Sequence, residues 1–293
     1  MGRFIGRYPW SPRMAAYTAV FLASTAVFMA VRFPSARLLE MVNQSLAAAP
    51  VNIAAQEARL TFPPGLKLSN VAVAEKNKPL AKILTVDSLV IRPSILAALT
   101  GGLKGSASSS LLGGTAEGEA KINTGGGKSE LEISFEKLDP ALGDWWSGFP
   151  WFKAEGKLGG SGKLEITGGQ VMTAVGWLKM EVADGRIIFN KSLSSGGAPL
   201  SITSGELELK LSNGALTIGK GVFHGPQGDL LLAGGMGLAP DLPESRLNIV
   251  ATLTMTEAAK AGLGGVAMFL PPAAPGGKHV FRIGGTLGQP LLR

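Results

Sequence analysis

The sequence predicts a mainly β protein in which an N-terminal transmembrane helix precedes an antiparallel meander of strands, with one or two short helices. Three observations support this fold class. Glycine contributes 41 of 293 residues, roughly twice its usual share, while aromatic residues make up only 6%. Polar and apolar residues alternate through several short stretches, as in half-buried strands. One long uncharged apolar stretch stands near the N-terminus.

The apolar stretch Met14–Val31 is the strongest positional signal. It carries no charge, and as a helix it would be about 27 Å long, close to the roughly 30 Å hydrocarbon thickness of a bilayer. Arg3, Arg7 and Arg13 precede it, which favours a cytoplasmic N-terminus and places the rest of the chain outside the cytoplasm. The predicted anchor residues are Met14, Tyr17, Phe21, Leu22, Phe28 and Val31.

Two other interpretations of this stretch stay open: a signal peptide cleaved near Ser24 and Ala26, or a buried helix of a soluble domain. Pro34 is expected to interrupt the helix. Apolar residues then follow at helical spacing, so we expect a second helix that rests on lipid headgroups or caps the β domain. The predicted organisation is a cytoplasmic segment 1–13, an anchor 14–31, a juxtamembrane helix 32–50 and a periplasmic β-rich domain 51–293.

The meander is predicted most firmly by the stretch that begins at Gly205. Leu207, Leu209 and Leu211 alternate with polar residues, which places the three leucines on one face of a strand. Asn213-Gly214 then predicts a type I′ hairpin turn. Pairing across this turn sets Leu211 opposite Leu216 and Leu209 opposite Ile218, so the apolar residues of both strands share one face.

The same alternation recurs along the chain. "HGPQG" at His224–Gly228 predicts a turn and Asp229–Met236 a third strand. Further predicted strands are Leu131–Phe135, Lys163–Thr167, Arg246–Thr254 and Val280–Ile283. A short helix is predicted near Pro93–Leu99. Segments resembling linkers are Gly101–Gly118, Ser192–Ala198 and Pro271–Gly277.

No pattern of reactive residues predicts an enzyme. The chain has no cysteine, which excludes disulfides and thiolate chemistry. "GGGKS" at Gly125–Ser129 lacks the first glycine of a phosphate loop, since that position holds Ile122. His224 and His279 stand apart, and we expect both in surface turns. We therefore expect no catalytic residue, cofactor or metal.

The two aspartates near the aromatic cluster and the net charge do not predict a catalytic or nucleic-acid-binding site either. Asp139 and Asp144 are explained by a turn and a helix N-cap rather than by paired catalytic carboxylates. The net charge of +7 comes without a dense basic run, so nucleic-acid binding is not expected.

An aromatic cluster stands out at "DWWSGFPWF". Trp145, Trp146 and Trp151 lie in it, and tryptophan favours surfaces at which one edge of the ring stays hydrated. Two interpretations remain. The cluster either forms a hydrophobic plug over one end of the sheet, or contacts a protein partner or lipid.

The residues also resemble a known family. "FPSARLLEMVNQSLAAAPVNIAAQEARLTFPPGLKLSNVAV" and "VDSLVIRPSILAALTGG" resemble the amino-terminal module of AsmA-like proteins, and "VFRIGGTLGQPLLR" is similar to their terminal strand. The middle, including "ISFEKLDP" and "GKLGGSGKLEITGG", looks most like GspN, the N component of the type II secretion system, in its deltaproteobacterial form. The resemblance spans most of the chain from about Phe33 onward.

This resemblance implies an inner-membrane anchor, a curved periplasmic sheet forming an open groove or half-barrel, and no catalytic residues. It implies an accessory role in protein secretion, with other envelope proteins as partners. The alternative is a lipid-binding groove in outer-membrane biogenesis, lined by Leu207, Leu209, Leu211, Leu216 and Ile218. Alternation alone does not separate an open groove from a closed sandwich whose core these residues fill.

Overall fold

The turn at Asn213-Gly214 organises the hairpin that the sequence predicts. Both residues have positive φ, 50° and 70°, as a type I′ turn requires. They join β10 (Leu200–Ser212) to β11 (Ala215–Gly225). The predicted pairs Leu211 with Leu216 and Leu209 with Ile218 are confirmed. Beyond them the register shifts by one residue, so that Glu208 pairs with Lys220 rather than with Gly219.

The computed structural model describes most of the chain from Val51 onward. The described residues are 40, 51–62, 65–75, 78–94, 103–123, 127–143, 152–168, 171–189, 199–239, 244–262, 270–274 and 277–292. The predicted anchor 14–31, its candidate residues, and Trp145, Trp146 and Trp151 lie outside this part. Of the predicted juxtamembrane helix 32–50, only Glu40 is described, and it is helical.

The described strands form one 15-stranded antiparallel sheet, which confirms the mainly β prediction. The strands that precede the hairpin are β1 Val51–Ala54, β2 Glu57–Thr61, β3 Gly65–Glu75, β4 Lys78–Pro93, β5 Leu103–Leu111, β6 Gly114–Ile122, β7 Lys128–Leu138, β8 Phe152–Thr167 and β9 Val175–Phe189. The strands that follow it are β12 Gly228–Gly237, β13 Arg246–Met255, β14 Lys278–Gly285 and β15 Pro290–Leu292.

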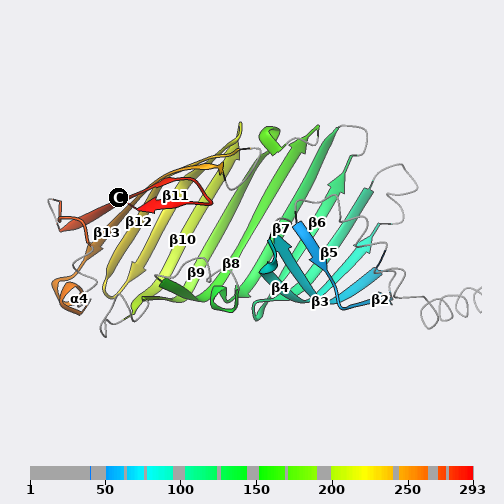
Figure 1. The fold of residues 1–293 in the computed structure, drawn as a ribbon, viewed down its shortest axis with the longest axis horizontal. Helices are drawn as coiled ribbons and strands as arrows, with labels where there is room; N and C mark the ends of the chain where they lie inside the picture. The colour runs from blue at the N-terminus through cyan, green and yellow to red at the C-terminus, as the bar shows by residue number, and fades with distance from the viewer. Residues whose placement is uncertain are drawn as a thin grey trace, which may run out of the picture.

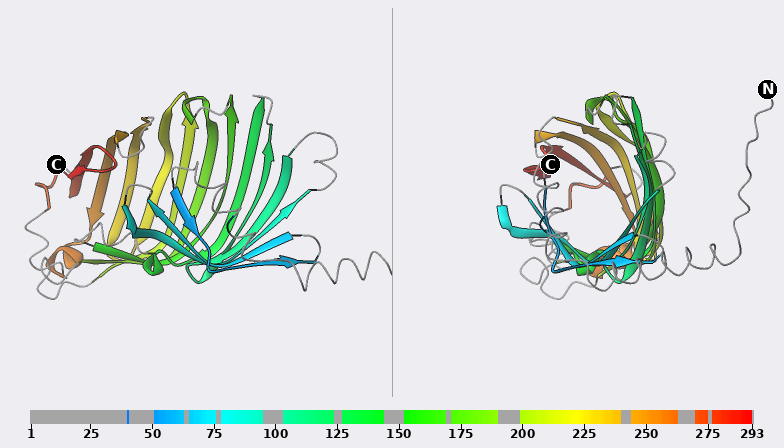
Figure 2. Two further views of the ribbon diagram at one scale, coloured as in Figure 1. Left: turned by 45° about the vertical axis from the view of Figure 1, so that its right-hand side comes forward. Right: turned by 90° about the vertical axis from the view of Figure 1, so that its right-hand side faces the viewer.

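Strand order in the sheet follows chain order from β3 to β15 (Figure 1). At the first edge, β1 and β2 pair end to end with β3. A view along the row of strands shows the sheet curved into a trough that is open on one side (Figure 2, right). This arrangement is an antiparallel meander, as the alternation predicts, and it is an open sheet, as the resemblance implies, rather than a closed two-sheet sandwich.

Bulges within the strands account for the curvature. Asn70, Lys137 and Asp184 lie inside β3, β7 and β9 with φ of 49°, 56° and 52°. Leu68 and Val71 are buried in one cluster although three positions separate them, so the two consecutive residues between them point to the other face. An extra residue on one face lengthens that face and bends the strand toward the opposite one. The sheet therefore curves toward the face that carries the leucines.

Helices contribute little to the described fold. They are the 3₁₀ turns η1 (Pro140–Leu142) and η3 (Val171–Thr173) and the short helix α4 (Glu257–Gly262). The predicted helix at 93–99 is wrong at its start, because β4 continues through Pro93. Its remaining residues from 95 onward lie outside the described part. Within the described residues, no helix has the length and apolarity needed to cross a bilayer.

The linker prediction for Gly101–Gly118 is also wrong. Residues 103–111 form β5, and β6 begins at Gly114. Alternation is present in both strands, but the residues on the leucine face are small, such as Ala107 and Ala116, so the apolar signal is weak. Of the other two predicted linkers, 192–198 lies outside the described residues, and 271–274 is irregular apart from one bridge, between Ala274 and Lys278.

Candidate functional site

The candidate site is the concave face of the trough, which we name the inner face. It is the face that carries Leu207, Leu209, Leu211, Leu216 and Ile218. The pairing registers identify the residues of the remaining strands that share this face. Those members on the central and C-terminal strands include Leu131, Ile133, Phe135, Leu158, Leu164, Leu178, Met180, Leu230, Leu232, Leu247, Ile249, Leu253, Phe281 and Ile283. Among the strand residues whose side chains are described, alternation and the bulges assign no Asp, Glu, Lys or Arg to this face.

The inner face is filled by protein at its N-terminal end. Leu68, Val71, Val86 and Ala58 form a packed cluster in which the side chains are 2%, 1%, 8% and 4% exposed. Leu66, Leu84, Leu89 and Leu111 are among the residues that pack against it. This end of the trough is therefore an ordinary hydrophobic core, with no room for a ligand.

The inner face is open over β4 to β7. There Ile91, Leu103, Ile122, Leu131 and Ile133 are between 37% and 52% exposed, although each faces the concave side. They surround a hollow of ≈ 510 Å³, which we name the central hollow. Its floor consists of small residues, chiefly Gly105, Ala107, Ala116, Gly118 and Ala120. Large apolar side chains around a concave, unfilled space are typical of a binding site for an apolar ligand.

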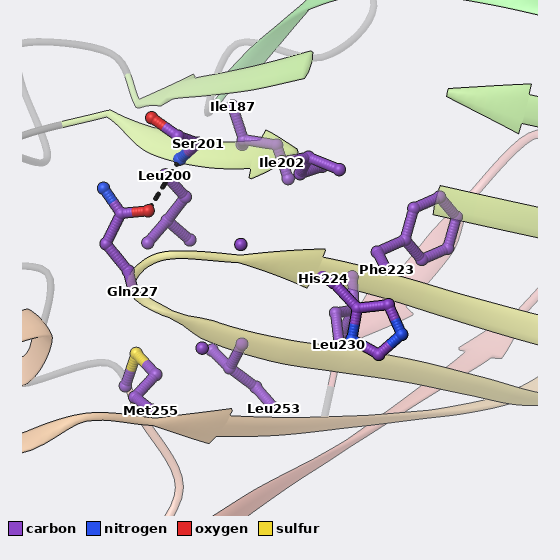
Figure 3. Close-up of a pocket in the computed structure, with 12 residues that line it drawn as sticks. Ile187, Leu200, Ser201, Ile202, Phe223, His224, Gln227, Leu230, Leu253 and Met255 are labelled. Atoms are coloured by element: carbon purple, nitrogen blue, oxygen red, sulfur yellow. Dashed lines mark hydrogen bonds between the residues drawn. The ribbon is translucent and has the colours of Figure 1, made fainter. Parts of the chain in front are cut away.

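A much smaller hollow lies farther along the trough (Figure 3). Leu200, Leu230, Leu253 and Met255 converge on it from β10, β12 and β13. Gln227 closes one side, because its Oε1 accepts a hydrogen bond of 3.0 Å from the backbone N–H of Ser201. The volume is ≈ 40 Å³, far below the roughly 300 Å³ at which small-molecule sites begin. The central hollow is therefore the better candidate.

The five groove residues predicted from the sequence lie on the inner face, but beside the central hollow rather than in it. They belong to β10 and β11 and are half-buried. The residues that surround the central hollow come from β4 to β7, and sequence reasoning missed most of them. β5 and β6 were missed because 101–118 was predicted to be a linker. The available signal was the alternation of small residues that face inward in these two strands.

The opposite, outer face is charged and solvated. Ion pairs join neighbouring strands across it: Lys104 with Glu119, Lys121 with Glu130, Lys128 with Glu165, Lys163 with Glu132, Lys179 with Glu208, and Lys220 with Glu206. A hydrogen bond from Lys128 lowers the pKa of Glu165, and one from Lys179 lowers the pKa of Glu208. These exposed pairs stabilise the fold little individually. Their charges keep the outer face hydrated, so the outer face is much more polar than the inner face.

We expect acid to weaken these cross-strand pairs. Because the pKa of Glu208 is lowered in the folded state, its contribution is complete above the ordinary glutamate pKa of about 4.3 and is lost as the pH falls through the lower folded value. Glu208→Gln should therefore reduce the drop in melting temperature between pH 7 and pH 3. Circular dichroism melts check this, with Glu181→Gln on the neighbouring strand as control. Equal changes in both variants would contradict a role for the bond from Lys179.

The two histidines lie in different environments, one exposed and one buried. His224 is exposed at the end of β11, with Nδ1 2.8 Å from Oδ1 of Asp229. The surface-turn prediction is wrong for His279, which lies in β14 and is only 6% exposed. Its Nδ1 lies 2.7 Å from the carbonyl oxygen of Pro271. Its position opposite Leu253 puts it on the inner face, so the carbonyl oxygen of Pro271 contacts a residue of that face at the C-terminal end.

The remaining polar candidates have structural roles where they are described. Asp139 Oδ1 accepts a hydrogen bond of 2.9 Å from the N–H of Ala141 and caps η1, which confirms the turn interpretation. Lys128 of "GGGKS" begins β7 and pairs with Glu165. Asp144 lies outside the described residues. No group of three or more metal-binding side chains occurs in the part of the chain that the structure describes.

Comparison with known proteins gives no further assignment. No family model matches the chain, and neither a curated protein nor a solved structure matches it significantly.

Proposed function

We propose that the protein binds the acyl chains of lipids on the inner face of its trough and has no catalytic role. The observation that carries this proposal is the contrast between the two faces of one sheet. The outer face carries the charged residues, whereas the described side chains of the inner face are mostly apolar, and large aliphatic side chains are exposed around the central hollow. A soluble surface rarely leaves such residues uncovered without a ligand or partner.

Acyl chains suit this surface energetically. Each buried CH₂ group contributes about 0.8 kcal/mol, so a plain apolar wall supplies affinity without any hydrogen-bonding residue. The resemblance to AsmA-like proteins agrees with this role. A periplasmic location, anchored in the inner membrane through 14–31, would place the trough beside a source of lipid, and this part of the proposal rests on the sequence alone.

The test is lipid binding by the purified full-length chain. We expect wild-type protein extracted in mild detergent to carry phospholipid or fatty acid detectable by native mass spectrometry. Ile133→Asp, which places a charge in the central hollow, should lower the occupied fraction at least tenfold. Ser134→Asp introduces the same charge on the outer face of the same strand and should leave occupancy unchanged. Wild-type protein without lipid, even after incubation with phospholipid vesicles, would contradict the proposal.

A second proposal follows from the resemblance to GspN. The protein would then be an accessory component of the type II secretion system, and its open sheet would act as a scaffold for other envelope proteins. Deleting the gene should leave secreted proteins stranded in the periplasm. Normal secretion in the deletion strain would remove this proposal and leave lipid binding intact.

A further inference from the structure

The exposure of the inner face differs sharply along the trough. Leu68 and Val71 are 2% and 1% exposed at the N-terminal end, whereas Leu103 and Ile122 are 52% and 51% exposed in the central hollow. These residues are of the same kind and lie on the same face. The difference therefore reflects whether protein already covers them.

The C-terminal end is covered as well. Ala251 and Met255 of β13 are both 7% exposed, and His279 of β14 is 6% exposed. At this end His279 Nδ1 also contacts the carbonyl oxygen of Pro271. Between this end and the N-terminal core, the described part of the inner face is most exposed at the central hollow.

Resting on the proposed lipid-binding function, we infer that the central hollow takes one acyl chain from the side of the trough, with the headgroup left outside, and that the trough is not a conduit open from end to end. A continuous channel would need uncovered apolar surface at β2–β3 and at β13–β14. At β2–β3 the cluster around Leu68 fills the inner face, and at β13–β14 Ala251, Met255 and His279 are buried.

The chemistry of the hollow favours an acyl chain over a peptide. An extended peptide laid on the inner face would leave its N–H and C=O groups unpaired, because the backbone groups of β4 to β7 are engaged with one another in the sheet. An acyl chain has no such groups to satisfy.

The small residues of the floor provide a specific way to close the hollow. Ala107 pairs with Gly118 on one side and with Ile91 on the other. A tryptophan at position 107 would lie over Gly118, where there is no side chain to displace, and aromatic side chains pack well over glycines of neighbouring strands. Ala107→Trp should therefore fold and occupy the space of the ligand. Ser108→Trp adds the same ring to the outer face of the same strand.

The experiment maps where lipid lies. Full-length protein is incubated with photoactivatable palmitate, irradiated, digested and analysed by mass spectrometry. We expect adducts on peptides of β4 to β7 and none on β2–β3 or β13–β14. Ala107→Trp should lower the adduct yield at least tenfold, and Ser108→Trp should leave it within twofold of wild type.

The possible outcomes separate the inference from the function on which it rests. Adducts spread over β2–β3 and β13–β14 would overturn the inference and retain lipid binding, since the trough would then be a continuous channel. An unchanged yield in Ala107→Trp would also overturn it. An absence of adducts at saturating probe, together with the absence of copurified lipid, would remove the proposed function itself.

Discussion

Leu68→Asp is expected to unfold the N-terminal end of the sheet and to lower the free energy of unfolding by about 4 kcal/mol or more. Leu68 is 2% exposed and packs in the cluster with Val71, Val86 and Ala58. The substitution removes a buried aliphatic side chain, which alone costs about 2–5 kcal/mol, and buries a carboxylate with no partner. Urea denaturation measures the loss, and amide hydrogen exchange should show it concentrated in β2 to β4.

Leu103→Asp provides the matched control on the same face. Leu103 is 52% exposed, so the carboxylate stays in water and the free energy of unfolding should change by about 0.5 kcal/mol or less. The same variant should lose lipid binding, because the charge lies in the central hollow. A large loss of stability in Leu103→Asp would show that the hollow is a packed core and would contradict the contrast on which the proposed function depends.

Gly234→Ala is expected to cost about 3 kcal/mol, although it adds a single methyl group. Gly234 has a φ of 105°, which L-residues rarely adopt, and a Cβ atom would lie 2.1 Å from the backbone oxygen of Asn248. That oxygen belongs to β13, which pairs with β12 along its length, so neither strand can move without breaking the ladder. Urea denaturation again measures the effect.

Gly237→Ala on the same strand serves as control for this prediction. A Cβ atom there meets nothing within 4 Å, so the melting and denaturation midpoints should remain close to those of the wild type. Equal effects of the two substitutions would mean that β12 does not approach β13 as closely as the structure shows.

Much of the meander could be predicted because its signals are local. The Asn213-Gly214 turn and the alternating leucines determined both the pairing and the shared face, and four consecutive pairs from Leu209 to Ser212 follow the expected register. The register shift beyond them could not be predicted, because a bulge depends on how far a strand must bend to follow its neighbours. Curvature therefore came from the resemblance rather than from periodicity.

The central hollow was missed for a different physical reason. Sequence reasoning finds a buried face by large apolar residues, but the floor of a binding site must be small to leave space. Ala107, Ala116 and Gly118 alternate with polar residues as strands require, yet their composition is typical of a loop. His279 was misplaced because its burial depends on Pro271, a contact made by a segment outside the sheet.

Strand order that repeats chain order also has a consequence for biogenesis. From β3 to β15 each strand needs only the one before it as a template, so the sequence separations between partners are short and contact order is low, which favours rapid folding. During synthesis, each new strand can pair with the strand before it as the chain emerges, before the C-terminal residues have been made. The trough could likewise be lengthened or shortened by whole hairpins, so its reach is a property that gene duplication can adjust.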